Sequence, residues 1–255
     1  FITDLIDEEE YLNYVNHSSE DALKTSSEKE EEENENENPL SIEQMDLNNF
    51  KSDKKIDKNA SSKLYIYIDE KTNQNYLAKI PLFRNKKKEI STFFNEIEIL
   101  TKLSSTLILK FIGYNLKGII KKPLPTIIFE YVSNGSLNSL MNRNKRNPNE
   151  WTKTKKLIAI YGIAAGMAYL HSKNIIHRNL KLDSIYFDDY LLPKITNFIY
   201  SIHEKDLTSD GNNKIIGTTL YLAPEILKDK KYSKSSDVYS FSMILYKIIT
   251  DKNPF

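Results

Sequence analysis

The sequence predicts an α+β protein with two lobes, in which a sheet-rich first part is followed by a helical second part. Short runs rich in β-branched and aromatic residues at 64–68 and 76–80 are separated by seven polar residues, a pattern typical of a β-hairpin. Apolar residues then recur every three or four positions over 152–172 and again over 235–250, which is typical of amphipathic helices. The change of periodicity along the chain therefore indicates a sheet lobe before a helical lobe.

The charges of the chain are unevenly distributed. Residues 1–50 carry 16 acidic and 2 basic residues, a net charge of −14, whereas residues 51–255 carry 34 basic and 19 acidic residues, a net charge of +15. A basic surface can bind nucleic acid or an anionic membrane. The simpler interpretation is a solvated, lysine-rich surface, because no basic cluster is interleaved with aromatic residues. We therefore expect no nucleic-acid partner.

Two absences from the sequence limit the class of protein. The chain has no cysteine, so disulfides and thiolate metal sites do not arise, and a cytoplasmic protein is the simplest expectation. No apolar run approaches the roughly 18–20 residues that a membrane-spanning helix needs. We expect no membrane span.

Residues 1–49 are predicted to be an acidic and mostly disordered N-terminal segment. Apolar residues at helical spacing over 2–15 are typical of a short amphipathic helix that docks on something. From 17 to 38 the sequence is polar and rich in glutamate, so it cannot bury enough apolar area to offset the entropy of ordering. This tract either folds back on the basic remainder or is a solvated linker, and we favour the linker.

The folded part is expected to begin near Phe50. After the hairpin, a helix is predicted over 91–103, opened by Ser91 or Thr92, and two strands are predicted at 108–114 and 126–131. After Gly135 the pattern becomes helical. The predicted apolar face of the helix at 152–172 consists of Leu157, Ile160, Tyr161, Ala164, Met167 and Leu170.

One stretch of the helical part carries a recognisable motif. Residues 177–184 read His-Arg-Asn-Leu-Lys-Leu-Asp-Ser, and Asn197-Phe198-Ile199 follows thirteen residues later. The pair resembles the catalytic loop H-R-D-L-x-x-x-N and the D-F-G motif of the eukaryotic protein kinases. The resemblance implies a kinase-like fold with an N-lobe and hinge at 50–132 and a C-lobe at 133–255, which is incomplete and truncated after the large central helix.

Further positions match the family in the same order along the chain, from about Ile56 to the last residue. They are Lys79, Glu96, the hinge-like run Phe129-Glu130-Tyr131-Val132, Ala223-Pro224-Glu225 in place of A-P-E, and Asp237 at the start of the central helix. The sequence around Gly135-Ser136-Leu137 and Gly217-Thr218 is similar to that of the tyrosine-kinase-like branch. Several ordered matches make the resemblance far more specific than a single motif.

The resemblance implies a set of site residues. In the family the strand lysine, here Lys79, holds the α- and β-phosphates of ATP, and Glu96 is its ion-pair partner. Adenine would contact the hinge backbone and an apolar slot, here Glu130, Val132, Leu64, Leu77 and Tyr186. Lys181 matches the lysine that contacts the transferred phosphate.

Three positions depart from the family pattern where its chemistry is concentrated. Asn179 stands at the position of the proton-accepting aspartate, and an amide does not act as a base, a role typically worth about 10²–10⁴-fold in rate. Ser184 and Asn197 stand at the two magnesium positions, whereas magnesium prefers carboxylate ligands. We therefore predict a site without a metal, in which magnesium binds poorly and the charge neutralisation needed for phosphoryl transfer is lost.

The nucleotide site is altered as well. The stretch that matches the glycine-rich loop has Asp57, Asn59 and Ser62 at the glycine positions, where close approach of the backbone to phosphate is needed. By the resemblance, Leu77 stands in place of a small alanine and Tyr186 in place of an apolar residue, which predicts that the adenine slot is partly filled. The alternative is that the alignment is off by a residue at one or two of these steps. The Lys79–Glu96 pair favours ATP binding and the other changes oppose it. We expect ATP to bind weakly or not at all.

The leading hypothesis is a pseudokinase, a scaffold that engages an active kinase or a substrate protein without transferring phosphate. The alternative is a weakly active Ser/Thr-type kinase that uses Lys79, Glu96 and Lys181 with a rearranged metal site. A third hypothesis is a decayed or truncated product without a stable fold. Arg178 matches the arginine that pairs with a phosphorylated activation segment, here 200–222, so phosphorylation there is a candidate regulatory event.

Overall fold

The structure, a computed structural model, describes residues 44–58, 62–82, 86–119, 124–144, 151–207 and 214–254. The expected amphipathic helix at 2–15, the expected disordered tract at 17–38 and the loop position Asn59 lie outside the described residues.

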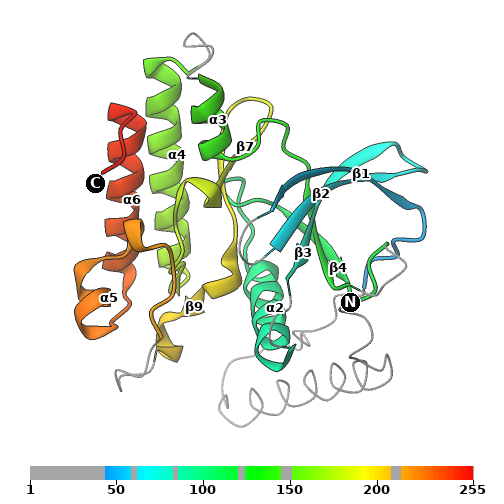
Figure 1. Ribbon diagram of the computed structural model, residues 1–255, viewed down its shortest axis with the longest axis horizontal. Coiled ribbons are helices and arrows are strands. Elements are labelled where there is room, and N and C mark those ends of the chain that lie inside the picture. The colour runs from blue at the N-terminus through cyan, green and yellow to red at the C-terminus, as the bar shows by residue number, and fades with distance from the viewer. Residues whose placement is uncertain are drawn as a thin grey trace.

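A five-stranded antiparallel sheet forms the first lobe (Figure 1). Its strands are β1 Phe50–Lys58, β2 Ser62–Asp69, β3 Gln74–Pro81, β4 Phe111–Asn115 and β5 Thr126–Glu130, in the spatial order β1-β2-β3-β5-β4. The predicted hairpin is present, with Asp69 opposite Gln74 across its turn. Helix α2, Lys86–Thr101, packs beside this sheet and faces the second lobe.

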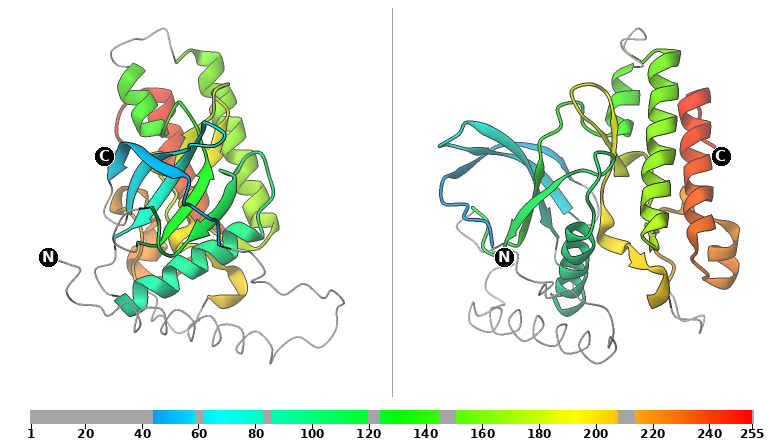
Figure 2. Two further views of the ribbon diagram at one scale, coloured as in Figure 1. Left: turned by 90° about the vertical axis from the view of Figure 1, so that its right-hand side faces the viewer. Right: turned by 180° about the vertical axis from the view of Figure 1, so that it is seen from behind.

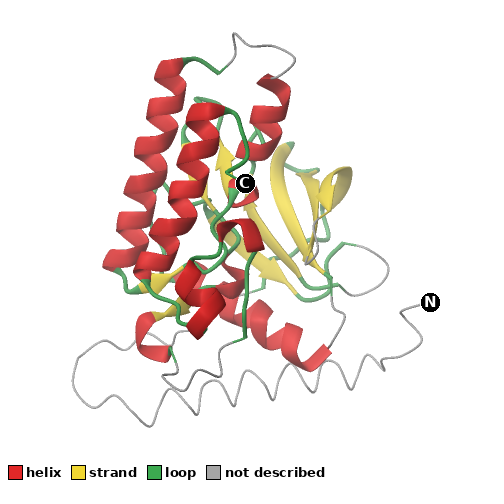
Figure 3. Ribbon diagram, turned by 60° about the vertical axis from the view of Figure 1, so that its left-hand side comes forward, coloured by secondary structure: helices red, strands yellow, loops and turns green. Residues whose placement is uncertain are grey.

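The second lobe is mainly helical, as predicted, and its helices gather on one side of the molecule (Figure 3). They are α3 Leu137–Asn144, α4 Lys153–Ser172, α5 Pro224–Asp229 and α6 Lys234–Thr250. Two short antiparallel pairs lie between these helices and the sheet lobe: β6 Ile175–Ile176 with β9 Ile202–His203, and β7 Ile185–Phe187 with β8 Pro193–Ile195. Four single-turn 3-10 helices, at 182–184, 198–200, 204–206 and 219–221, complete the described elements. The α+β two-lobed prediction is confirmed.

Packing of the sheet lobe begins before Phe50. Leu47 is only 4 % exposed and joins a buried cluster with Tyr67 and Ile128 on one face of the sheet. The backbone N–H of Met45 donates to the carbonyl of Tyr114 on the edge strand β4, at 2.8 Å. Residues 44–50 therefore connect β4 to β1 across the sheet.

Two predicted element boundaries were wrong. The helix expected at 91–103 begins at Lys86, so neither Ser91 nor Thr92 opens it. The strand expected at 108–114 begins at Phe111, because residues 107–109 instead run beside β8, where the N–H of Leu109 donates to the carbonyl of Ile195 at 2.9 Å. Local pattern could not reveal the start of β4, since the contacts of residues 107–109 with the distant β8 decide it.

The predicted buried face of α4 was wrong in part: Met167 and Leu170 are buried as predicted, and Ala164 is exposed. Leu157 and Tyr161 are 66 % and 78 % exposed, and the buried residues are Ala159, Gly162, Ile163, Gly166, Met167 and Leu170. The middle of this helix is apolar on every side, so periodicity does not select a face. The two glycines do, because they allow α4 to approach β8 closely: a Cβ on Gly162 would lie 2.5 Å from Cγ of Pro193.

One large hydrophobic core joins the two lobes. It runs from Leu64 and Leu77 in the sheet through Ile97 and Leu100 in α2 to Ile244 and Ile248 in α6. The right-hand view of Figure 2 shows α2 and the β7–β8 region lying between the sheet and the long helices. Among the helices in the described ranges, none is both long and apolar enough to cross a lipid bilayer.

Candidate functional site

Lys79 and Glu96 meet in the interior between β3 and α2. The ammonium nitrogen of Lys79 lies 2.6 Å and 2.7 Å from the two carboxylate oxygens of Glu96. Lys79 is 4 % exposed and Glu96 is 1 % exposed, so water screens this ion pair little. Strand β3 is paired on both sides, with β2 and with β5, which fixes the direction of Lys79. The structure thus brings together the two residues that the sequence placed in one site.

Asn197 is the third member of this group. Its side-chain oxygen accepts a hydrogen bond from the Lys79 ammonium at 3.2 Å. Its backbone is left-handed, with φ 71° and ψ 56°, a conformation that asparagine tolerates better than most side chains. The neutral amide of Asn197 is therefore directed at Lys79 and is engaged by it.

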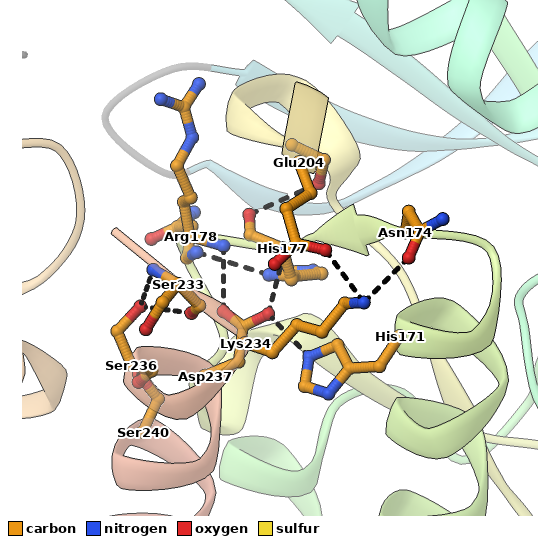
Figure 4. A network of polar contacts seen from close by, with 12 residues as sticks. His171, Asn174, His177, Arg178, Glu204, Ser233, Lys234, Ser236, Asp237 and Ser240 are labelled. Atoms are coloured by element: carbon orange, nitrogen blue, oxygen red, sulfur yellow. Dashed lines mark hydrogen bonds and ion pairs between the residues drawn. The ribbon is translucent and has the colours of Figure 1, made fainter. Parts of the chain in front are cut away.

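The loop 177–184 is held from below by Asp237 in the first turn of α6 (Figure 4). The Asp237 carboxylate accepts from the backbone N–H of His177 at 2.8 Å and of Arg178 at 3.0 Å, and it lies 3.1 Å from Nε2 of His171. These bonds stabilise a loop in which Arg178 has a positive φ of 61°. A capping box between Ser233 and Ser236 begins α6 and places Asp237 under the loop.

His177 is buried at the centre of this arrangement. Its Nε2 lies 2.9 Å from the carbonyl oxygen of Thr196, and its Nδ1 accepts from the N–H of Asn179 at 3.2 Å. These partners require the neutral ring with the proton on Nε2. Burial lowers the pKa of His177, against the opposing effect of the nearby Asp237 carboxylate. The ring also packs edge-on against Phe198, with centroids 5.3 Å apart.

Ser184 and Asn179 are linked through the backbone. The Ser184 hydroxyl donates to the carbonyl oxygen of Asn179 at 2.8 Å, and Ser184 has no exposed surface. The hydroxyl therefore stabilises the loop. Lys181, by contrast, is partly exposed and its ammonium lies 3.2 Å from the hydroxyl of Thr218.

The residues predicted to form the adenine slot lie in one buried cluster. Leu64, Leu77, Val132 and Tyr186 are each 8 % exposed or less and belong to the same core as Phe129. Glu130 differs, because its carboxylate accepts from the backbone N–H of Lys110 at 2.9 Å and pairs with Lys194 at 3.0 Å. Lys194 was missed by sequence reasoning, and no local signal marks it, since its partner is 64 positions away.

Of the three residues that replace glycines of the family's phosphate-binding loop, Asp57 and Ser62 lie within the described residues. Ser62 begins β2, where it lies opposite Pro81 and is fully buried. The backbone of Asp57 in β1 pairs with Leu64.

The residues at the predicted metal positions do not offer magnesium the ligands that it prefers. Within the ranges that the structure describes, no three His, Asp or Glu side chains come together as a set that could hold a metal ion. Of the two positions that match metal ligands, Ser184 donates its proton to the backbone and Asn197 accepts from a lysine ammonium. A cation at Asn197 would compete with the Lys79 charge 3.2 Å away. The residues present do not fit a magnesium site.

A five-stranded sheet with a buried lysine–glutamate pair, joined to a helical lobe that supports a His-Arg loop, defines a kinase-like class of protein. The family model of the protein kinase domain matches residues 50–255. The chain belongs to the protein kinase domain family.

Curated relatives come from several kinds of kinase. The chain is 38 % identical over 165 residues to cysteine-rich receptor-like protein kinase 25 of Arabidopsis thaliana, a match that covers 63 % of this chain and 24 % of the relative. It is 31 % identical over 217 residues to an Aurora kinase of Yarrowia lipolytica, covering 82 % of this chain and 54 % of the relative. The matched region is thus about a quarter of the plant relative and about half of the Aurora kinase.

Proposed function

We propose that this chain is a pseudokinase, a kinase-shaped scaffold that binds a protein partner in phospho-signalling and does not transfer phosphate. The observation that carries the proposal concerns Asn179, Ser184 and Asn197, the three positions that depart from the family pattern. Asn197 is bonded to Lys79, Ser184 is bonded to the carbonyl of Asn179, and all three side chains are neutral. Neither a proton acceptor nor a metal-binding carboxylate stands at these positions.

Weak or absent ATP binding is part of the same proposal. The side chains of Leu64, Leu77 and Tyr186 are buried in the same apolar cluster as the hinge residue Val132, so adenine would have to displace apolar contacts of that cluster. The Lys79 ammonium, which would meet the phosphates, already has three oxygen partners. Both observations support a domain that is stable without a nucleotide.

A protein partner, either an active kinase or a substrate, fits the exposed apolar residues of the helical lobe. Leu157 and Tyr161 on α4 and Ile249 on α6 are each more than 60 % exposed. Helices α4 and α6 contact each other, and a large exposed apolar patch marks a site of protein association. We further propose the tyrosine-kinase-like branch, a cytoplasmic location, no nucleic-acid partner, and a division into a segment 1–49, an N-lobe with hinge 50–132 and a C-lobe 133–255.

The second candidate function is a weakly active Ser/Thr-type protein kinase. It is favoured by the close contact of Lys79 with Glu96, by the position of Lys181 beside Thr218, and by relatives whose names are those of kinases. This candidate needs a route for charge neutralisation that the residues near Asn197 do not supply.

One experiment separates the two candidates. Phosphotransfer from ATP to a mixed peptide library is measured for the wild type and for the triple variant Asn179→Asp/Ser184→Asn/Asn197→Asp, with Lys79→Met added to each as the matched control. The scaffold proposal expects no Lys79-dependent transfer by the wild type. Transfer by the wild type that needs magnesium and disappears with Lys79→Met would establish the enzyme instead.

A further inference from the structure

The guanidinium group of Arg178 is already engaged within the described part of the chain. Its Nε donates to the carbonyl oxygen of Tyr200 at 2.5 Å. Its central carbon lies 5.4 Å from the centroid of the Tyr232 ring, within the range of a cation–π contact. Burial lowers the pKa of Arg178 from its usual high value. In Figure 4 the Arg178 side chain runs away from Asp237, whose carboxylate bonds to its backbone instead.

Tyr232 also forms hydrogen bonds with Ile216, in the stretch 214–218. Its hydroxyl accepts from the N–H of Ile216 at 2.6 Å and donates to the carbonyl of Ile216 at 2.8 Å. Tyr232 is 5 % exposed and packs with Leu222 and Ile226. One buried side chain therefore supports Arg178 with its ring and residue 216 with its hydroxyl.

A separate set of contacts holds the stretch 200–207, through Glu204. Lys234, the first residue of α6, lies 2.8 Å from a carboxylate oxygen of Glu204 and 2.7 Å from the side-chain oxygen of Asn174. The N–H of Glu204 donates to the carbonyl of Asn174 at 2.7 Å, next to the β6–β9 pair. Figure 4 shows these three residues converging beside the Asp237 network.

We infer that Tyr232 and Lys234 set two described stretches, residues 200–207 and 214–218, in place without a phosphate group. Tyr232 gives Arg178 a cation–π contact where a phosphorylated residue would give an ion pair. Lys234 fixes the chain where it leaves β9. Phosphorylation of Ser201 or Thr218 is then not required for order in these two stretches. The inference does not depend on whether the domain transfers phosphate.

Hydrogen exchange of the full chain, followed by mass spectrometry, tests this inference. The protein is compared as purified and after treatment with a phosphatase, with complete dephosphorylation verified by intact mass. We expect the peptides covering 200–207 and 214–218 to be protected equally in both samples. Exchange that accelerates in these two peptides on dephosphorylation, or rapid exchange there in a protein that carries no phosphate, would overturn the inference.

Two variants test the contact of Tyr232 with Ile216 and the contact of Lys234 with Glu204 separately. Tyr232→Phe keeps the ring under Arg178 and removes both hydrogen bonds to Ile216. Exchange over 214–218 should therefore rise by at least about five- to tenfold, which is the worth of one ordinary hydrogen bond. Lys234→Met should raise exchange over 200–207 and leave 214–218 unchanged. Tyr246→Phe and Lys230→Met, at exposed positions, are the controls. Equal exchange in Tyr232→Phe and wild type would also refute the proposal, and unchanged protection of α4 peptides shows that each variant is folded.

Discussion

The ammonium group of Lys79 lies 3.2 Å from the side-chain oxygen of Asn197, while Glu96 holds the same ammonium from the other side at 2.6 Å. The contact joins β3 to the 3-10 helix Phe198–Tyr200, which packs against α2. An aspartate at 197 would place Lys79 between two carboxylates and leave a negative charge to be balanced. With asparagine the group is neutral as it stands, so it needs no cation to be stable.

The effect of the buried Lys79–Glu96 ion pair on the free energy of unfolding should be large and should depend on whether one partner or both are removed. Lys79→Met leaves Glu96 charged and buried, and we expect a loss of about 3–5 kcal/mol in the free energy of unfolding. The double variant Lys79→Met/Glu96→Leu should recover much of this loss, since no unpaired charge remains. Denaturant unfolding monitored by circular dichroism measures both.

The exposed pair Glu98–Lys102, at 2.8 Å across the C-terminal end of α2, is the matched control for that experiment. Its removal should cost less than about 1 kcal/mol. A double variant at 79 and 96 that is no more stable than Lys79→Met would show that the unpaired carboxylate is not the source of the loss.

The close contact between α4 and β8 predicts an unusual effect of alanine in a helix. Gly-to-Ala substitution within a helix ordinarily stabilises by about 1 kcal/mol. At Gly162 the new methyl group would lie 2.5 Å from Cγ of the rigid Pro193 ring, so Gly162→Ala should instead destabilise by about 1–3 kcal/mol. Gly166→Ala should cost less, because its nearest neighbour is the end of the Ile195 side chain.

Thermal melting of the two variants provides the measurement. Ala168→Gly, at an exposed position of the same helix, reports the propensity effect without any packing contact. An increase in the melting temperature of Gly162→Ala would contradict the proposed packing of α4 on β8.

Acid should destabilise the protein through His177. Burial holds the pKa of this ring below its ordinary value of 6.5 in the folded state. Below that pH the unfolded chain binds a proton that the folded protein does not, so stability rises with pH and falls on acidification below about 6.5, by up to roughly 1.4 kcal/mol per pH unit. Above that pH the ring is neutral in both states and contributes no slope.

Unfolding free energies measured between pH 5 and 8 test this. The variant His177→Gln should be less stable at neutral pH, because the bonds to Thr196 and Asn179 change, and should lose less stability between pH 7 and 5 than the wild type. Identical pH profiles for the two proteins would assign the acid sensitivity to other groups.

Opening the apolar slot should improve nucleotide binding. The double variant Leu77→Ala/Tyr186→Leu removes side-chain volume beside Val132, and we expect ATP to raise its melting temperature more than that of the wild type. Isothermal titration calorimetry gives the affinities. Ile226→Ala creates a cavity in a separate cluster and is the control. Equal ATP affinity in all three proteins would show that filling of the slot is not what limits binding.

The sequence predicted much of the fold and of the site, and the failures have a common cause. The hairpin, the Lys79–Glu96 encounter and the Asp237 support were predictable because each is tied to a motif or a strong local pattern. The buried face of α4 was not, because that helix is apolar all round and two glycines decide its packing. Contacts between distant residues without a motif, such as Lys194 with Glu130 and Arg178 with Tyr232, leave no local pattern at all.

A thermal-shift titration of the full chain with ATP, with and without magnesium, tests the central claim most directly. A ligand that binds only the folded state stabilises it by RT ln(1 + [L]/Kd), so even modest affinity is detectable. The pseudokinase account predicts a small shift or none, unchanged by magnesium, because the positions at 184 and 197 do not fit a metal. A large shift that appears only when magnesium is present would contradict it.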